Sequence, residues 1–305
     1  MVSAPQPPSA VPSWQPGRYV WPRGRTKLIL LGGIGSRTGD AEKAYRGLLG
    51  FMAQRGGYDA RRDVLEATYA GSEVDGAWQP RPYVAADTRR PLIDAAEAVA
   101  GSLEWYRNAL PADARLFVLG YSLGGVAALD GVTLALARDR AGWAGRLGGV
   151  ITLAAPVRGC NAGPLMNWAW LVTSEPDALG QAGADLDARW RDDEEQARLR
   201  RRADFVRAAG VRVLTLADPD DAVVRPEEAL LPGPGESIED LLIPVTIRRP
   251  GSLGHGAILD EPAVWRRVLA VVGRQEVGDG PAAVDPIESE LEALKARMRA
   301  QGRLR

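Results

Sequence analysis

Short runs of apolar residues alternate along the chain with longer segments in which apolar and polar residues recur at helical spacing. The run KLILLGG (27–33) is apolar, short and ended by glycines, which is typical of a strand buried on both faces. Similar runs recur further along the chain. The six predicted strands span residues 27–33, 64–69, 115–121, 148–156, 211–217 and 243–249.

Helices are expected between these strands. Asp40 is placed to cap one of them, and Asp87-Thr88 to cap another. The predicted helices cover residues 40–55 and 87–110, the Ala-rich stretch from 123, and residues 257–272. The segment GSEVDGAWQPRP (71–82) is expected to be a loop. This alternation predicts the α/β class, a mostly parallel sheet of about six strands with helices on both faces.

Residues 157–210 interrupt the alternation and are too long for a connecting loop. They hold an aromatic cluster with Met166, Trp168 and Trp170, and a charged run over 187–205 that reads as a solvated helix face. We expect this insertion to be a helical cap over a core formed by residues 27–156 and 211–273.

The two ends of the chain have a different composition from the core. Residues 1–26 are rich in proline and are expected to form an extended arm. Residues 274–305 are expected to be a linker followed by a helix. Ile287, Leu291, Leu294 and Met298 line one side of that helix, which could dock on the domain or mediate self-association with a second subunit.

Composition and charge exclude several classes of function. With 46% hydrophobic and 25% charged residues, the chain resembles a soluble globular protein. A formal net charge of −1 gives no reason to expect binding to nucleic acid or to an anionic membrane. No apolar run is long enough to span a bilayer, and residues 1–16 lack the features of a signal peptide. A cytoplasmic location is expected, or secretion if the chain is a processed mature form.

The segment Gly120-Tyr121-Ser122-Leu123-Gly124 carries the strongest chemical signal. It is a G-x-S-x-G pattern between a predicted strand and a predicted helix, the context of a nucleophile elbow. Small residues allow the tight turn that exposes a serine hydroxyl, so Ser122 is the candidate nucleophile. A chance match to a short motif is the alternative, and the strand–turn–helix context argues against it.

A serine hydroxyl needs a base that accepts its proton. The chain has a single histidine, His255, in a glycine-rich loop after the last predicted strand, so any Ser-His machinery must use it. With one histidine and one cysteine, a zinc site is not expected, and no cofactor is predicted.

An acid should orient the histidine, and three candidates follow the strand at 211–217. They are Asp218, Asp220 and Asp221. Asp221 is preferred because D-x-V-V places it where the loop turns back, and Asp218 is the next choice. The order Ser, Asp, His is the one expected when the serine lies on a strand-to-helix elbow.

Two backbone N–H groups are candidates for an oxyanion hole. Leu123 follows the nucleophile at the start of a helix, and Ile34 lies in the glycine-rich LGGIGS segment after the first strand. Gly33 is the less favoured alternative to Ile34, and a plain strand-to-helix turn is the structural alternative for this segment.

The motifs LILLGGIGS, VLGYSLGG, ITLAAPVRG, ADPDDAVV and GHGAILDEPAVWRRVL together resemble the α/β-hydrolase superfamily, in its lipase-like branch that includes GPI inositol-deacylase-like hydrolases. The resemblance covers residues 27–156 and 211–273. It implies a minimal form of that fold without its two N-terminal antiparallel strands. Gly32-Gly33 replaces the His-Gly that usually follows the first strand in that branch.

Together these features predict a serine esterase or lipase-like enzyme acting on a small-molecule or lipid-like ester. Ser122 would attack the carbonyl, His255 would carry the proton and Asp221 would hold His255. The aromatic cap residues favour an apolar acyl or alcohol part. A thioesterase or acyltransferase with the same triad, and a non-enzymatic binding protein on a hydrolase scaffold, are the alternatives.

Overall fold

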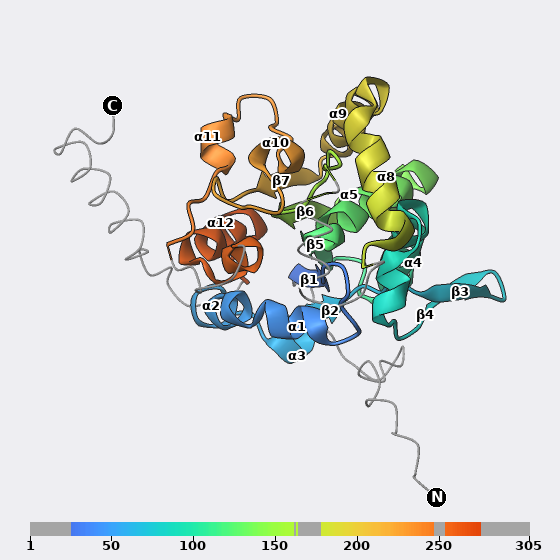
Figure 1. Cartoon of the computed structure of the whole chain (residues 1–305). Coiled ribbons are helices and arrows are strands. Elements are labelled where there is room, and N and C mark those ends of the chain that lie inside the picture. The colour runs from blue at the N-terminus through green and yellow to red at the C-terminus, as the bar shows by residue number, and fades with distance from the viewer. Residues whose placement is uncertain (1–25, 162, 164–177, 247–253, 276–305) are drawn as a thin grey trace, which may run out of the picture. The chain divides into compact units, whose positions relative to one another are not determined.

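The chain folds around a five-stranded parallel sheet in a computed structural model that describes residues 26–161, 163, 178–246 and 254–275 (Figure 1). The strand order is β2-β1-β5-β6-β7, and every neighbouring pair is parallel. The strands are β1 (Thr26–Leu31), β2 (Val64–Glu66), β5 (Arg115–Tyr121), β6 (Leu147–Leu153) and β7 (Arg212–Leu216). Because all five run the same way, the loops after them gather at one edge of the sheet.

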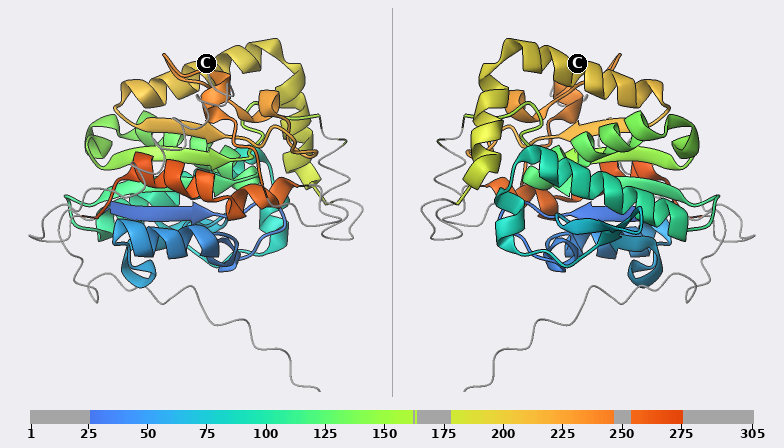
Figure 2. Two further views of the ribbon diagram at one scale, coloured as in Figure 1. Left: turned by 90° about the vertical axis from the view of Figure 1, so that its left-hand side faces the viewer. Right: turned by 90° about the vertical axis from the view of Figure 1, so that its right-hand side faces the viewer.

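Helices cover both faces of this sheet, as Figure 2 shows from two opposite sides. Helix α4 (Leu92–Ala109) and helix α5 (Leu123–Arg138) pack on one face, and α2 (Arg46–Gly56) and α12 (Pro262–Val272) lie together on the other. Short helices complete the connections. They are α1 (Asp40–Ala44), α3 (Ala60–Asp63), α6 (Arg140–Trp143), α10 (Pro226–Ala229) and α11 (Ile238–Leu241), with 3₁₀-helices at Ala85–Arg89 and His255–Asp260. Burial on both faces explains why the strands are continuous apolar runs.

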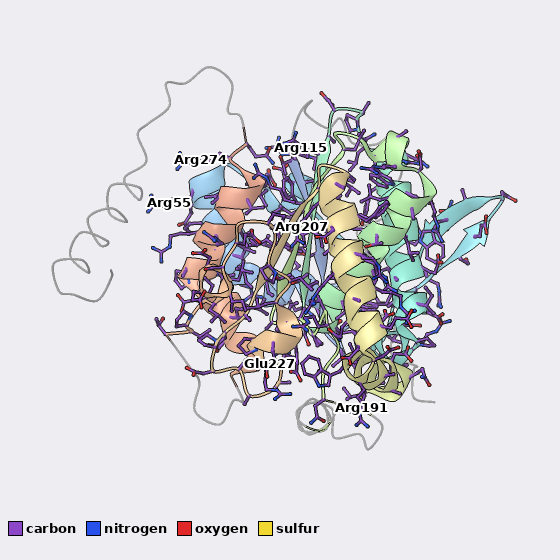
Figure 3. All side chains as sticks on the ribbon, turned by 90° about the horizontal axis from the view of Figure 1, so that it is seen from above. Arg55, Arg115, Arg191, Arg207, Glu227 and Arg274 are labelled. Atoms are coloured by element: carbon purple, nitrogen blue, oxygen red, sulfur yellow. The ribbon has the colours of Figure 1, made fainter. Side chains whose placement is uncertain are left out.

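The described part of the insertion between β6 and β7 contains two long helices. Helix α8 (Gly180–Arg191) and helix α9 (Asp193–Ala208) replace the single charged helix expected there. The break falls at Asp192, whose side chain accepts hydrogen bonds from the N–H groups of Glu194 and Glu195 and so caps α9. Figure 3 shows α9 from above, running from near Arg191 toward Arg207.

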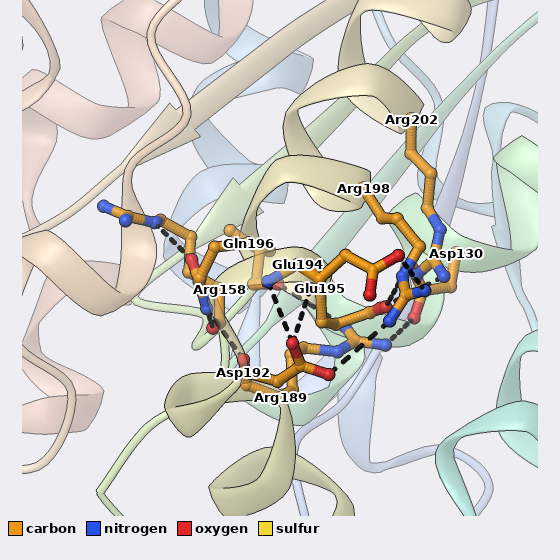
Figure 4. Close-up of polar contacts among 10 residues, drawn as sticks. Asp130, Arg158, Arg189, Asp192, Glu194, Glu195, Gln196, Arg198 and Arg202 are labelled. Atoms are coloured by element: carbon orange, nitrogen blue, oxygen red, sulfur yellow. Dashed lines mark hydrogen bonds and ion pairs between the residues drawn. The ribbon is translucent and has the colours of Figure 1, made fainter.

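Charged side chains join this insertion to the core (Figure 4). Arg189 of α8 lies 2.6 Å from Asp130 of α5, and Arg202 of α9 lies 3.6 Å from the other carboxylate oxygen of Asp130. Glu195 pairs in turn with Arg202 at 3.1 Å and with Arg198 at 2.7 Å. The charge run is therefore only partly a solvated face, because two of its arginines bind α5, the helix that begins directly after Ser122.

The prediction of a sixth strand over 243–249 is wrong for residues 243–246, and residues 247–249 lie outside the described part. Only an isolated bridge joins Ala217 to Leu242. Ile243 still donates its N–H to the carbonyl of Ala217 at 2.8 Å, but Pro244 has no N–H with which to continue a ladder. The N–H of Thr246 is instead bound by the carboxylate of Glu261 at 2.9 Å.

The segment at 71–82, expected to be a loop, forms a hairpin. Strands β3 (Gly71–Val74) and β4 (Ala77–Pro80) pair in antiparallel register and project from the body (Figure 1). Asp75 and Gly76 connect them with φ of 51° and 74°, the two positive values that a type I′ turn requires. The Asp-Gly pair explains why the chain reverses here.

Three expected helices are each broken once. The first is interrupted at Tyr45, between α1 and α2. The second, expected over 87–110, is a 3₁₀-helix followed by α4, which begins after Pro91. The third, expected over 257–272, is a 3₁₀-helix followed by α12, which begins at Pro262. Proline suits the start of a helix but not its interior, because it lacks the N–H that interior positions donate.

The expected N-terminal arm, the aromatic cluster of the insertion and the expected C-terminal helix lie outside the described residues. Among the described helices, none combines the length and the apolarity needed to cross a membrane.

The first and last residues of the described body bind each other. Thr26 donates its N–H to the side-chain oxygen of Gln275 at 3.0 Å, and the amide nitrogen of Gln275 donates to the Thr26 carbonyl at 2.6 Å. Gln275 also donates its own N–H to the carbonyl of Gly56 at 2.8 Å. Its side chain therefore pairs with the start of β1 much as a neighbouring strand would.

Candidate active site

Ser122 lies on a sharp turn between β5 and α5. Its backbone has φ of 53° and ψ of −129°, a combination that a residue with a side chain rarely adopts. Two hydrogen bonds hold it there, from the Ser122 N–H to the Leu153 carbonyl at 3.0 Å and from the Gly125 N–H to the Ser122 carbonyl at 2.9 Å. The predicted elbow is therefore present, with the serine at its apex.

Two glycines permit this turn because neighbouring backbone approaches them closely. A Cβ atom on Gly120 would lie 2.2 Å from the carbonyl oxygen of Gly124. A Cβ atom on Gly124 would lie 2.5 Å from the carbonyl oxygen of Gly32. Any larger residue would force these segments apart, so the pattern around Ser122 has a steric cause.

His255 begins the 3₁₀-helix that precedes α12. Its Nε2 atom lies 2.9 Å from Oγ of Ser122, and its Nδ1 atom lies 2.7 Å from Oδ2 of Asp221. The ring of Tyr121 lies against the imidazole, with 5.0 Å between centroids. Burial raises the pKa of the Tyr121 hydroxyl well above its usual range, and the negative charge of Asp221 raises it further. Tyr121 is therefore a neutral neighbour of the histidine.

Among the three candidate acids, the structure places Asp221 against the histidine. The second carboxylate oxygen of Asp221 accepts hydrogen bonds from the N–H groups of Val223 at 2.8 Å and Val224 at 3.1 Å. Asp218 is buried but accepts a hydrogen bond from the N–H of Asp220, and Asp220 is exposed. The D-x-V-V turn thus fixes one oxygen of Asp221 and aims the other at His255.

The three side chains are almost completely shielded from water. Ser122 and His255 are each 1% exposed and Asp221 is 5% exposed. Low local polarity strengthens hydrogen bonds that involve charge. An ionised carboxylate can only accept hydrogen bonds, so Asp221 favours the tautomer of His255 that carries its proton on Nδ1. The lone pair of Nε2 then faces the Ser122 hydroxyl. In this arrangement the imidazole can remove the proton of Ser122.

The loop after β1 lies beside the serine. A Cβ atom on Gly33 would lie 3.1 Å from Cβ of Ser122. In the described part of the chain, neither the N–H of Ile34 nor that of Leu123 has a hydrogen-bond acceptor. The N–H of Leu123 is at the first position of α5, where no partner exists within the helix. Both predicted oxyanion donors are therefore available to a ligand.

Two side chains that the sequence did not indicate hold this loop. Thr88 accepts a hydrogen bond from the N–H of Gly35 at 2.9 Å and donates to the Ala85 carbonyl at 2.7 Å. Tyr69 donates to the carbonyl of Gly32 at 2.6 Å. Thr88 was expected to help cap a helix, and no local pattern connects it with a glycine loop more than fifty positions away in the chain.

A third contact joins Thr246 to the start of α12. Glu261 accepts hydrogen bonds from the Thr246 N–H at 2.9 Å, from the Thr246 hydroxyl at 2.8 Å and from the Ala263 N–H at 3.2 Å. These bonds lower the pKa of the Glu261 carboxyl although burial acts to raise it. Glu261 therefore ties Thr246 to the helix that follows His255. The capping role of an acid just before proline is the sequence signal that could have identified it.

Comparisons with known proteins give structural matches only. No protein-family model and no curated protein matches this chain. Among solved structures, two of phospholipase PlaB from Legionella pneumophila have 16% and 14% identity and TM-scores of 0.41 and 0.46. They cover 64% and 68% of this chain but 38% and 45% of the phospholipase, so this chain spans less than half of that protein.

Two further matches cover nearly all of the proteins concerned. The peroxisomal alpha-beta-hydrolase Lpx1 from Saccharomyces cerevisiae is 14% identical with a TM-score of 0.43, covering 93% of this chain and 87% of Lpx1. Another structure, from a study of the metagenome-derived lipolytic enzymes LipS and LipT, is 15% identical to this chain with a TM-score of 0.48. The match covers 83% of this chain and 95% of the chain in that structure.

All of these TM-scores lie below 0.5, so the fold is assigned from the topology of this chain. The parallel strand order β2-β1-β5-β6-β7 places the elbow after β5 and the acidic loop after β7, and the histidine precedes the final helix of the described body. This chain has an α/β-hydrolase fold.

Proposed function

We propose that this protein is a serine hydrolase that cleaves carboxylic esters through an acyl-enzyme on Ser122. One observation carries the proposal. An elbow serine with φ of 53° lies 2.9 Å from the only histidine of the chain, which lies 2.7 Å from a buried aspartate. A buried imidazole between a hydroxyl and a carboxylate is the arrangement that activates a serine.

In the first half of the reaction, Oγ of Ser122 attacks the ester carbonyl carbon while Nε2 of His255 takes the hydroxyl proton. The carbonyl oxygen becomes an oxyanion. When the carbon–oxygen bond to the alcohol breaks, His255 gives its proton to the departing alkoxide, which leaves as an alcohol. The acyl group remains on Ser122.

In the second half, a water molecule takes the place of the alcohol. His255 removes a proton from this water while the water oxygen attacks the acyl carbon. Collapse of the intermediate breaks the bond to Ser122, and His255 returns the proton to the serine oxygen. The products are a carboxylic acid and the original enzyme, so atoms and charges balance.

Asp221 and two backbone N–H groups complete the proposed machinery. Asp221 would keep the proton on Nδ1 and stabilise the imidazolium that forms in each half. Ile34 and Leu123 would donate their N–H groups to the oxyanion, where preformed donors stabilise developing charge. The substrate would be a small-molecule or lipid-like ester with an apolar part, in keeping with Met166, Trp168 and Trp170 of the insertion.

The experiment that tests this proposal is labelling with a fluorophosphonate, followed by assays on p-nitrophenyl esters. Intact-mass measurement of the full chain should show one adduct, located on Ser122. Ser122→Ala should abolish both the adduct and ester hydrolysis. Ser102→Ala, which removes a buried hydroxyl on α4, should retain both.

Each alternative has its own outcome in this experiment. A protein that takes no label and hydrolyses no ester would be a binding protein on a hydrolase scaffold. A labelled protein that prefers acyl thioesters to esters by more than tenfold would be a thioesterase. One that transfers the acyl group to an added alcohol faster than to water would be an acyltransferase.

A further inference from the structure

A cavity of about 540 Å³ opens between α9 and α10, and its lining does not include the Ser122 site. Figure 3 labels Arg207 and Glu227, two of its lining residues, on the same side of α9. Its volume lies within the range of about 300–1,000 Å³ typical of small-molecule sites. The cavity is therefore large enough for a ligand that the proposed reaction does not require.

One part of the lining is apolar. Leu230 and Leu231, each 4% exposed, form part of the inner wall, and Ile238, which is 51% exposed, belongs to the same lining. Ala203 of α9 and two prolines continue this surface. An alkyl chain placed here would remove apolar surface from water on both partners, which is the main source of affinity for such groups.

The other part of the lining is charged, and both of its acids already have partners. Asp204 pairs with Arg207 at 3.2 Å, and Glu227 pairs with Arg225 at 3.2 Å. Three arginines and two acids line the cavity, which leaves one positive charge. A single negative charge on a ligand would balance it.

Arg158 and Arg200 are the two lining arginines that have no carboxylate partner within the described residues. Arg158 donates instead to two neutral oxygens. One is the side-chain oxygen of Gln196 at 2.9 Å (Figure 4), and the other is the Glu227 carbonyl at 2.9 Å. Burial lowers the pKa of the Arg158 guanidinium, and the positive charge of Arg200 lowers it further, against the opposite effect of Glu227. Both arginines line the same cavity, so an anion bound there would offset the repulsion between their positive charges.

We propose that this cavity binds a monoanionic amphiphile of the medium-chain carboxylate class. The carboxylate would lie between Arg158 and Arg200, because guanidinium groups bind carboxylates through paired, charge-assisted hydrogen bonds. The alkyl chain would lie over Leu230, Leu231 and Ile238. This inference is independent of the chemistry proposed at Ser122.

The test uses the full chain carrying Ser122→Ala and sodium decanoate as the probe, with binding measured by isothermal titration calorimetry. Arg200→Gln should weaken binding by about tenfold, because it removes a charge-assisted hydrogen bond. Arg201→Gln is the matched control. It removes the same charge one position along α9, but Arg201 lines a separate groove with Thr133 and Ala137, so its effect should stay below about twofold.

A second pair of variants tests the apolar half. Ile238→Ser should weaken decanoate binding by about fivefold, from loss of buried apolar area. Ile93→Ser changes an equally exposed isoleucine on α4, at 57% exposure, and should leave binding unchanged. Acetate, which has a carboxylate but no chain, should not bind measurably.

Three results would overturn the proposal. They are no measurable binding of decanoate, equal losses in Arg200→Gln and Arg201→Gln, and binding that neither Arg200→Gln nor Ile238→Ser changes. The last result would place the ligand elsewhere, including at the Ser122 site. Because hydrolysis is not measured, failure of this proposal and failure of the proposed reaction can be told apart.

Discussion

Arg189 of α8 and Asp130 of α5 form an ion pair of 2.6 Å in which both side chains are only about one-tenth exposed, at 10% and 11%. Asp130 lies on α5, which begins directly after Ser122, so this pair joins the insertion to the helix that follows the elbow. Removing one partner from such a pair leaves a charge that is largely cut off from water.

Arg189→Met should therefore lower the free energy of unfolding by about 2 kcal/mol, less than for a fully buried pair because Arg202 also faces Asp130 at 3.6 Å. Urea denaturation measures this change. The control is Arg191→Met, on the same helix, where the arginine side chain is 72% exposed and pairs with Asp187. Equal effects of the two variants would show that the Asp130 contact does not support the fold.

Asp221→Asn should reduce kcat by about 10⁴, because the amide no longer holds the histidine in the tautomer that accepts the serine proton. Asp218→Asn and Asp220→Asn should have much smaller effects, since neither side chain is the one that contacts His255. Steady-state kinetics on one ester compares the three. If Asp218→Asn proved the most damaging, the role proposed for Asp221 would be wrong.

Thr88→Val should lower kcat by roughly tenfold with little change in KM, since it removes the acceptor that holds the Gly35 N–H beside Ile34, the proposed oxyanion donor. Valine has nearly the same size and shape as threonine, so this variant removes the hydrogen bond to the loop but keeps the packing. Thr133→Val makes the same change on α5, where the hydroxyl binds only the Leu129 carbonyl at 2.8 Å. Comparable losses in both variants would point to general destabilisation instead of a role in positioning the loop.

Glu261 should make stability depend on pH on the acidic side. The pKa of Glu261 is lower in the folded protein than in the unfolded chain, where the pKa of a glutamate is about 4.3. The ionised Glu261 therefore adds its full share to the free energy of unfolding above the unfolded-state pKa. This share is lost as the pH falls through the lower pKa that Glu261 has in the folded protein.

Glu261→Gln should lower the free energy of unfolding at pH 6, and the difference from the original protein should shrink below about pH 4 as Glu261 becomes protonated. Urea midpoints measured from pH 6 to pH 3 test this. Glu42→Gln, on the exposed face of α1, should have little effect at any pH. A difference that stays constant down to pH 3 would contradict the ionic role of Glu261.

The sequence singled out residues that the structure brings together, and the reason is physical. Ser122 and Asp221 both follow buried apolar strands, and the carboxyl ends of parallel strands share one edge of the sheet. The elbow around Ser122 also has strict steric demands, which small residues at fixed spacing express locally. The choice of Asp221 over Asp218 was harder, because it depends on how the N–H groups of Val223 and Val224 orient one carboxylate.

Contacts between distant segments could not be predicted in this way. The bond from Gly35 to Thr88 joins two loops through folding alone, and neither loop carries a pattern that points to the other. Other differences had visible signals. The Asp75-Gly76 pair is typical of a hairpin turn, and Pro244 is typical of the point where a strand ends.

The pairing of Gln275 with Thr26 has a consequence for how this domain could be rearranged. Since the two ends of the described body touch, a short peptide could connect them without stretching or crossing the molecule. New ends could then be opened at the tip of the β3–β4 hairpin, between Asp75 and Gly76, which projects from the body. A circularly permuted protein of this design should keep the sheet and the Ser122 elbow intact. Because its two ends lie together, the domain should also tolerate insertion as a unit into a surface loop of another protein.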